Sequence, residues 1–130
     1  MELKERLKKL AKLFERLREG RIFVEGKKDR GALEKLGFAG ILTISGNLRQ
    51  SCERAAQENA QKVFVLSDLD RRGDELAKRA WDELGSLSIR ADTETRRELA
   101  HLLRIRCFED AKKAYDKLTE EMTEKGENNG

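Results

Sequence analysis

The chain has 130 residues, of which 41% are charged and 38% are hydrophobic, and it contains no proline. This length accommodates one hydrophobic core, and the hydrophobic residues recur in periodic runs, so the composition excludes a second independent domain and intrinsic disorder. The 28 basic and 25 acidic residues leave a net charge of only +3, which does not by itself attract a polyanion.

The first two thirds of the chain alternate between helical and strand patterns. Apolar residues recur at helical spacing over residues 3–17, and Gly20 follows where a helix would end. A short β-favouring run at residues 22–24 then predicts a strand, and a helical pattern covers residues 29–36. The alternation continues with strands predicted at residues 41–44 and 63–66, and with helices predicted around residues 52–60 and 76–84.

Beyond Gly85 the pattern is weaker. Asp92 is placed to cap a helix that carries three leucines, and residues 105–108 resemble a fourth strand at the edge of the sheet. A last helix around residues 111–122 closes the domain, and a tail at residues 126–130 is predicted to be disordered.

These elements predict an α/β fold with a mostly parallel, four-stranded sheet flanked by helices. Residues 1–19 form an extra amphipathic helix packed on a domain of residues 20–125. No apolar segment approaches the length of a membrane span, and no signal-like segment opens the chain, so we expect a cytoplasmic protein without a membrane partner. The abundance of Lys, Arg and Glu is typical of thermophilic proteins and makes a thermophilic origin a further hypothesis.

Three acidic residues stand at the ends of predicted strands. Glu25 follows the first strand, and Asp68 and Asp70 follow the third. Ligands bind outside the carboxyl ends of the strands in open α/β sheets, so these carboxylates converge if the two strands are neighbours. Clustered carboxylates repel one another unless a cation or a shared proton compensates them, and oxygen ligands favour Mg²⁺ or Mn²⁺. The alternative interpretation is that these residues cap the helices that follow.

Basic residues also follow the strand ends. The candidate phosphate contacts are Lys27, Lys28, Arg49, Arg71 and Arg72. In so basic a chain, they are explained equally well as solvated surface charges. Gly26 and Gly73, which follow the candidate acidic ligands, would let the backbone approach a phosphate closely.

Other residue types that often carry chemistry are better explained by packing. Trp81 and Phe64 stand at core spacing and are expected to pack in the interior rather than stack on bases. Tyr115 lies on the apolar stripe of the last helix, where a core role is expected. His101 lies beside a leucine stripe and is expected to be a surface or boundary residue.

Two segments resemble the signature motifs of the Toprim domain family. The first is Phe23-Val24-Glu25-Gly26-Lys27-Lys28-Asp29, and the second is Ser67-Asp68-Leu69-Asp70-Arg71-Arg72-Gly73-Asp74. The resemblance covers residues 20–84 and is fairly specific, because the motifs occur as an ordered pair on strand ends. Toprim domains occur in type IA topoisomerases, bacterial-type primases, gyrase-class B subunits, recombination-repair proteins and small RNA-processing nucleases.

The resemblance implies a role for each acidic residue. Glu25 would be a metal ligand or a catalytic general acid/base, and Asp68 and Asp70 would hold one or two Mg²⁺ ions, with Mn²⁺ as a substitute. Asp74 stands where topoisomerase-like members have a further acidic residue, so it is an additional candidate ligand. The implied activity is Mg²⁺-dependent cleavage of a phosphodiester, or phosphoryl transfer, on RNA or DNA.

The chain departs from the larger Toprim enzymes. A topoisomerase needs a nucleophilic tyrosine in a separate domain, and a primase needs template-handling domains that 130 residues cannot contain. We therefore expect a small stand-alone, nuclease-like Toprim protein that is neither a complete topoisomerase nor a complete primase. Two alternatives remain open: a non-catalytic, metal-dependent nucleic-acid-binding module within a larger protein assembly, and an enzyme that acts on a small phosphorylated metabolite.

Overall fold

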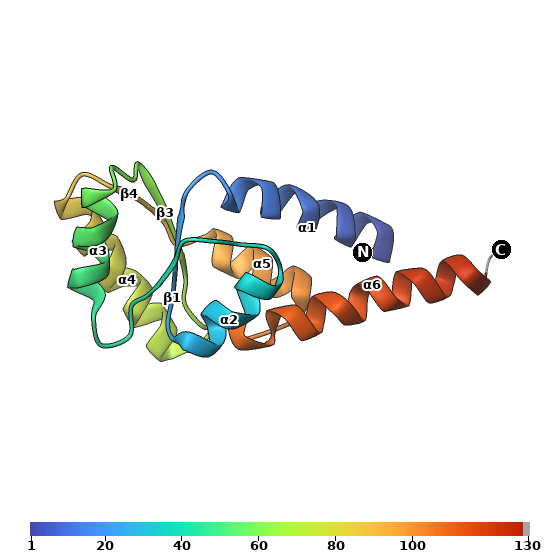
Figure 1. The fold of residues 1–130 in the computed structure, drawn as a ribbon. Coiled ribbons are helices and arrows are strands. Elements are labelled where there is room, and N and C mark those ends of the chain that lie inside the picture. The colour runs from blue at the N-terminus through green and yellow to red at the C-terminus, as the bar shows by residue number, and fades with distance from the viewer. Residues whose placement is uncertain (129–130) are drawn as a thin grey trace.

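The computed structural model describes the backbone of residues 1–128 and the side chains of residues 1–125. The elements alternate as expected for an α/β protein (Figure 1). In chain order they are α1 (Leu3–Leu17), β1 (Arg21–Val24), α2 (Lys27–Lys35), β2 (Ile41–Thr43), α3 (Leu48–Gln57), β3 (Lys62–Leu66), α4 (Arg71–Ser86), β4 (Arg90–Asp92), α5 (Thr95–Leu103), a 3₁₀ turn at Phe108–Asp110, and α6 (Ala111–Asn128).

The four strands form one parallel sheet in the order β2-β1-β3-β4. Ile22 of β1 is in register with Ile41 of β2 on one side and with Phe64 of β3 on the other. The chain therefore winds outward from β1 to β2 and then returns across β1 to reach β3. This reversal makes the space at the carboxyl ends of β1 and β3 the topological switch point of the sheet, where α/β proteins bind ligands.

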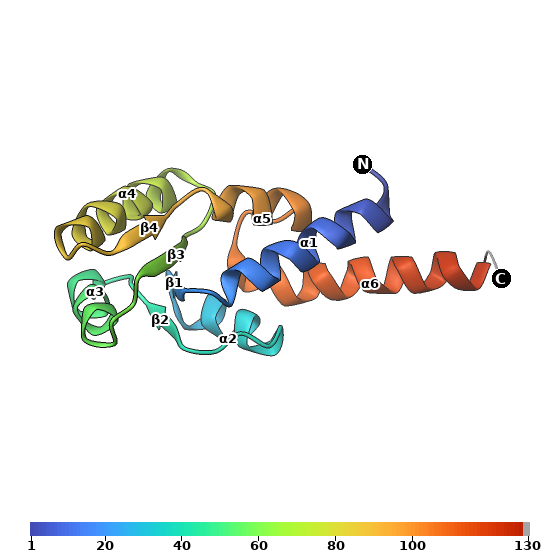
Figure 2. The same ribbon diagram turned by 90° about the horizontal axis from the view of Figure 1, so that it is seen from above.

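Both faces of the sheet are covered by helices, so β1, β2 and β3 supply side chains to two cores. Ile22 and Val24 of β1 belong to the core beneath α1, α2, α5 and α6, whereas Phe23 belongs to the core beneath α3 and α4. Figures 1 and 2 show these two groups of helices on opposite faces, with both termini on the side of α1 and α6. Burial on both faces explains why β1, β2 and β3 are nearly continuous apolar runs.

The amphipathic helix α1 covers part of the first core. Leu10 and Leu17 are fully buried, and Leu13 and Phe14 are nearly so. Each buried side chain of this size stabilises the fold by about 1.5–3 kcal/mol. The helix predicted at residues 3–17 is therefore an integral layer of the structure. Among the described residues, no helix has both the length and the apolar character needed to cross a bilayer.

The fourth strand was predicted at the wrong place. Residues 105–108 do not join the sheet; they form the loop that leads into the 3₁₀ turn, and Phe108 is fully buried in the first core. The fourth strand is β4, which has three residues and pairs with β3. It carries one alanine between an arginine and an aspartate, so no apolar run marks it in the sequence. The apolar character of residues 105–108 reflects packing by a loop.

The second difference concerns the end of the chain. Residues 126–130 were predicted to be disordered, but α6 continues through Asn128. Residues 129–130 lie outside the described residues.

Asp92 acts as predicted at the start of α5, since its Oδ1 accepts hydrogen bonds from the N–H groups of Glu94 and Thr95.

Gly73 allows the first turn of α4 to pack directly against the backbone that follows β3. A Cβ atom at residue 73 would lie 1.8 Å from the carbonyl oxygen of Asp68. The Ser67 hydroxyl reinforces this contact by donating a 2.7 Å hydrogen bond to the carbonyl of Gly73. The glycine thus serves a close approach between helix and strand, which fixes the position of Asp68.

This close approach predicts opposite effects for one substitution at two positions of α4. Gly73→Ala should lower the free energy of unfolding by about 3 kcal/mol, because backbone must move to admit the methyl group. Gly85→Ala should raise it by about 0.5–1 kcal/mol, because a Cβ there meets no atom within 4 Å and alanine favours the helix. Urea unfolding followed by circular dichroism measures both values, and equal effects would show that no close approach exists at residue 73.

Candidate metal centre

The structure brings Glu25 and Asp68 together at the switch point. Glu25 immediately follows β1, and Asp68 lies two residues beyond the end of the adjacent strand β3. The Glu25 Oε2 atom accepts a 2.6 Å hydrogen bond from the backbone N–H of Asp68. This contact, between residues 43 positions apart, places Glu25 against the backbone of Asp68 at the ends of the neighbouring strands β1 and β3.

One oxygen of each predicted ligand, Glu25, Asp68 and Asp70, accepts a hydrogen bond from a backbone N–H group. The other oxygen of each carboxylate has no hydrogen-bond donor among the described residues. Asp68 Oδ1 accepts the N–H of Phe108 at 3.2 Å, and Asp70 Oδ1 accepts the N–H of Gly73 at 2.6 Å. Asp70 is therefore the N-cap of α4, as the alternative interpretation proposed. Capping uses one oxygen only, so it does not exclude a second role for the same carboxylate.

A fourth carboxylate adjoins this group. Asp29, in the first turn of α2, is 7% exposed, and its Oδ2 accepts a 2.9 Å hydrogen bond from the N–H of Gly26. Burial, followed by the negative charges of Glu25 and Glu109, raises the pKa of Asp29, although the hydrogen bond from Gly26 opposes this. We define Glu25, Asp29, Asp68 and Asp70 as the acidic cluster.

No basic side chain neutralises the acidic cluster. Within the part of the chain that has described side chains, no ion pair includes any of its four members, although ion pairs cover much of the remaining surface. Burial, together with the negative charges of Glu25, Asp29 and Asp70, raises the pKa of Asp68 to about 6, although the hydrogen bond from Phe108 opposes this. The fold thus gathers acidic side chains at the switch point without an ion-pair partner among the described side chains, which favours binding of a cation.

The donor set fits a hard divalent cation. All four side chains offer oxygen, and no histidine lies among them, which matches the preference of Mg²⁺ and Mn²⁺. In the side-chain positions described for residues 1–125, however, no three acidic, histidine or cysteine groups converge closely enough to ligate one ion. A Mg²⁺ ion bound here would therefore take only part of its shell from the protein, as Mg²⁺ commonly does.

Asp74, the additional candidate ligand, is engaged elsewhere. Its Oδ1 accepts hydrogen bonds from the guanidinium groups of Arg96 and Arg97. The hydrogen bond from Arg96 is the main cause of the lowered pKa of Asp74. Asp74 thus contributes an ion pair beside the acidic cluster, and its metal-binding role stays a prediction.

Arg96 positions the backbone of the candidate site, although no motif in the sequence marks it. Its side chain is 2% exposed, and its Nε donates to both the carbonyl and the hydroxyl oxygen of Ser67 at 3.1 Å. Its Nη2 donates to the carbonyl of Asp68 at 3.0 Å. Arg96 therefore holds the backbone on which Asp68 stands. The available signal was its position on the buried stripe of α5 with Leu99 and Leu103, where a charged residue is unusual.

The predicted phosphate contacts do not form one patch. All five are exposed, but Arg49 and Arg72 line a groove of about 700 Å³ between α3 and α4, whereas Lys28 lines a different groove between α2 and α6. Arg49 and Arg71 each pair with a glutamate one helical turn away, Glu53 and Glu75. Lys27 lies in the first turn of α2, two residues after Glu25. Their contact with phosphate stays a prediction.

The aromatic side chains and His101 differ in how far they are buried. Phe64 is fully buried, and Tyr115 packs against the first core with its ring 5.3 Å from that of Phe14, so both predictions are confirmed. His101 is exposed, as expected. Trp81 was predicted to be buried, but its side chain is 57% exposed. The neighbouring positions Ala77, Ala80 and Leu84 supply the buried side of α4, which leaves Trp81 at the margin of that face.

Comparisons with known proteins agree with this geometry. The family model described as the Toprim domain matches residues 20–102, which include both signature motifs and all four strands. A solved structure of a protein from Aquifex aeolicus superimposes with a TM-score of 0.66 at 27% identity. It covers 78% of this chain and 93% of that protein.

The chain is also similar to several archaeal proteins named UPF0292. A UPF0292 protein of Pyrococcus furiosus is 44% identical over 98 residues, which are 73% of each chain. A UPF0292 protein of Pyrococcus horikoshii is 37% identical over 116 residues, or 85% of this chain and 87% of that one. The relatives come from thermophilic archaea, and a thermophilic origin for this chain stays a prediction. Because the matched model spans more than half of the chain and both motifs end adjacent parallel strands, the chain belongs to the Toprim domain family.

Proposed function

We propose that this protein is a Mg²⁺-dependent enzyme that cleaves or transfers a phosphodiester of nucleic acid. Toprim domains serve metal-dependent functions related to nucleic acids, and the proposal adds the reaction and the residues. One observation carries it: the acidic cluster stands at the topological switch point with no basic partner among the described side chains. A purely structural cluster would be expected to pair with arginine or lysine, as the surface carboxylates of this chain do.

In this proposal, Asp68 and Asp70 hold the cation with the oxygens that the backbone N–H groups leave free. A bound Mg²⁺ supplies Lewis acidity toward a phosphoryl oxygen and toward water. Glu25 lies beside Asp68, and its Oε1 has no described hydrogen-bond donor, so this oxygen can accept the proton of an attacking water.

The backbone contacts position these groups before a cation binds. Glu25 is tied to the N–H of Asp68, and Arg96 holds the carbonyl of the same residue. Asp70 is tied to the N–H of Gly73 within the first turn of α4. Rearrangement on metal binding is therefore limited to rotation of carboxylate side chains on a fixed backbone, which favours catalysis by preorganisation.

The first prediction for this site concerns metal binding. Isothermal titration calorimetry should detect binding of Mg²⁺ and Mn²⁺ to the wild-type protein, and Asp68→Asn should weaken it at least about tenfold, because a charged oxygen ligand is lost. Asp82→Asn, which removes one negative charge from an exposed position of α4, should leave the affinity unchanged. Equal affinities in the three proteins would rule out Asp68 as a ligand.

The second prediction concerns turnover. Labelled single- and double-stranded RNA and DNA should be cleaved in the presence of Mg²⁺ and not in EDTA, and Asp68→Asn should abolish cleavage while it preserves the fold. Glu25→Gln should lower the rate by about 10²–10⁴, because it removes a proton acceptor. Binding of nucleic acid without cleavage would instead support the non-catalytic module, and a nucleotide that raises the melting temperature without nucleic-acid binding would support a metabolite enzyme.

The third prediction concerns pH and the metal-free protein. The pKa of Asp68 is raised to about 6, so the folded protein retains a proton that the unfolded chain releases near the ordinary aspartate pKa of 3.8. The stability that this proton contributes is complete below about pH 4 and is lost as the pH rises to about 6. In EDTA at pH 7.5, Asp68→Asn should therefore be more stable than wild type by about 1–2 kcal/mol, a value reduced for partial exposure of the side chain.

Urea unfolding at pH 4 and at pH 7.5 measures this difference, with Asp82→Asn as the control for a lost surface charge. The gain from Asp68→Asn should vanish at pH 4. If Asp68→Asn raises the free energy of unfolding equally at both pH values, ionisation of Asp68 does not destabilise the folded protein.

A further inference from the structure

A second charged feature involves Leu69, the residue between Asp68 and Asp70, and its charge is positive. A pocket of about 590 Å³ opens between the start of α1 and the end of α5. Its polar lining consists of Arg6, Arg97, His101 and Arg104, and its other lining residues are apolar. No acidic side chain lines it among residues 1–125, although Arg97 also pairs with Asp74, which lies outside the lining. We call this the arginine pocket.

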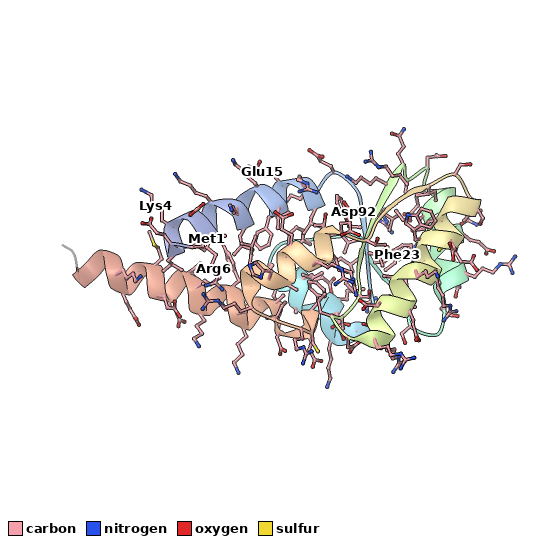
Figure 3. The ribbon with its side chains drawn as sticks, turned by 180° about the vertical axis from the view of Figure 1, so that it is seen from behind. Met1, Lys4, Arg6, Glu15, Phe23 and Asp92 are labelled. Atoms are coloured by element: carbon pink, nitrogen blue, oxygen red, sulfur yellow. The ribbon has the colours of Figure 1, made fainter. Side chains whose placement is uncertain are left out.

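Arg6 is the buried arginine of the arginine pocket, and a hydrogen bond to the backbone holds it in place. Its side chain comes from α1 and is only 8% exposed, and its Nε donates a 2.6 Å hydrogen bond to the carbonyl of Leu102. Figure 3 shows Arg6 on the side of α1 that faces the rest of the molecule, whereas Lys4 and Glu15 lie on the outer side. The Nε contact fixes the guanidinium plane and leaves the Nη groups available at the pocket wall.

The charge of Arg6 has no direct counterion. Among the described side chains, no carboxylate lies within ion-pair distance of it. Burial and the neighbouring charge of Arg104 lower the pKa of Arg6, and the more distant Glu121 offsets this only in part. Removing a guanidinium partly from water without a paired anion costs free energy. An anion bound in the pocket would offset this cost.

Arg104 adds a second sign that the pocket is adapted to its charge. It ends α5 in the left-handed conformation, with φ of 57° and ψ of 47°, which asparagine or glycine adopts more easily than arginine. The side chain of Arg104 lines the arginine pocket together with that of Arg6.

We propose that the arginine pocket binds a phosphate group of the substrate, adjacent to the metal centre. Guanidinium groups match phosphate oxygens in pairs, so two or three arginines around one cavity form a phosphate site rather than a site for a neutral ligand. Leu69 lines the pocket, and its chain neighbours Asp68 and Asp70 belong to the acidic cluster. A substrate phosphate held here would therefore lie against the segment that carries the proposed cation ligands.

This inference rests on the proposed function for the identity of the substrate, but the pocket can be tested without metal or turnover. In EDTA at constant ionic strength, inorganic phosphate should raise the melting temperature of the wild-type protein more than chloride does. Arg104→Asn should lower the affinity for phosphate about tenfold, because one charge-assisted contact is lost. Asparagine also suits the left-handed backbone, so this variant should fold.

Three further variants make the result decisive. Arg6→Lys keeps the charge but removes the fixed guanidinium plane, and it should weaken phosphate binding in the same way. Lys12→Gln removes one positive charge from an exposed position of α1 outside the pocket and should have no effect. Asp68→Asn should retain phosphate binding even where it abolishes metal binding. Phosphate affinities that are equal in wild type, Arg104→Asn and Lys12→Gln would overturn the pocket, whatever the outcome of the metal and cleavage experiments.

A comparison of oligonucleotides then distinguishes two sources of the phosphate. If the pocket holds a chain-end phosphate, a 5′- or 3′-phosphorylated oligonucleotide should bind about tenfold more tightly than its hydroxyl counterpart in wild type, and Arg104→Asn should remove the difference. If the pocket holds a backbone phosphate, Arg104→Asn should lower the affinity for both oligonucleotides by the same factor. If Arg104→Asn leaves the affinity for both oligonucleotides unchanged, the phosphate in the pocket does not come from nucleic acid. The phosphate site itself is tested by the experiment with inorganic phosphate.

Discussion

Repulsion among carboxylates at the ends of β1 and β3 is the constraint on which the rest of this site depends. Parallel pairing of these two strands places Glu25 against the backbone of Asp68, and α2 adds the buried Asp29. Such an arrangement opposes folding at neutral pH, because each ionised group raises the cost of ionising the next. It is maintained by the cores on both faces of the sheet, whose buried side chains supply far more stabilising free energy.

The backbone around Asp68 shows how the fold holds this group in place. Gly73 lets α4 begin in direct contact with the Asp68 carbonyl, and Arg96 reaches from α5 to the same carbonyl and to Ser67. The arginine therefore binds main-chain oxygens and Asp74, and leaves the carboxylate of Asp68 free of ion pairs. The positive charge of Arg96 thus orients the backbone near the site, and it does not pair with the carboxylates that are proposed to hold a cation.

Charge is separated across the short segment that follows β3. Asp68 and Asp70 belong to the acidic cluster, while the intervening Leu69 packs against the first core and lines the arginine pocket. The net charge of +3 conceals this separation, because it sums over surfaces with opposite local charge. A substrate that carries several phosphates is the kind of ligand for which a cation site beside an arginine site is useful, since successive phosphates can be held by different means.

The sequence by itself determined the alternation of strands and helices, the extra first helix, and the two motifs that identify Glu25, Asp68 and Asp70. These features depend on local periodicity and on residue types at strand ends, which are visible without long-range contacts. Tertiary structure alone decided that β1 and β3 are neighbours, that the three-residue β4 joins the sheet in place of residues 105–108, and that Trp81 is exposed. It also revealed the roles of Arg96 and Arg6. The partners of these arginines lie 28 and 96 residues away, and only the folded chain determines which buried charges have a partner.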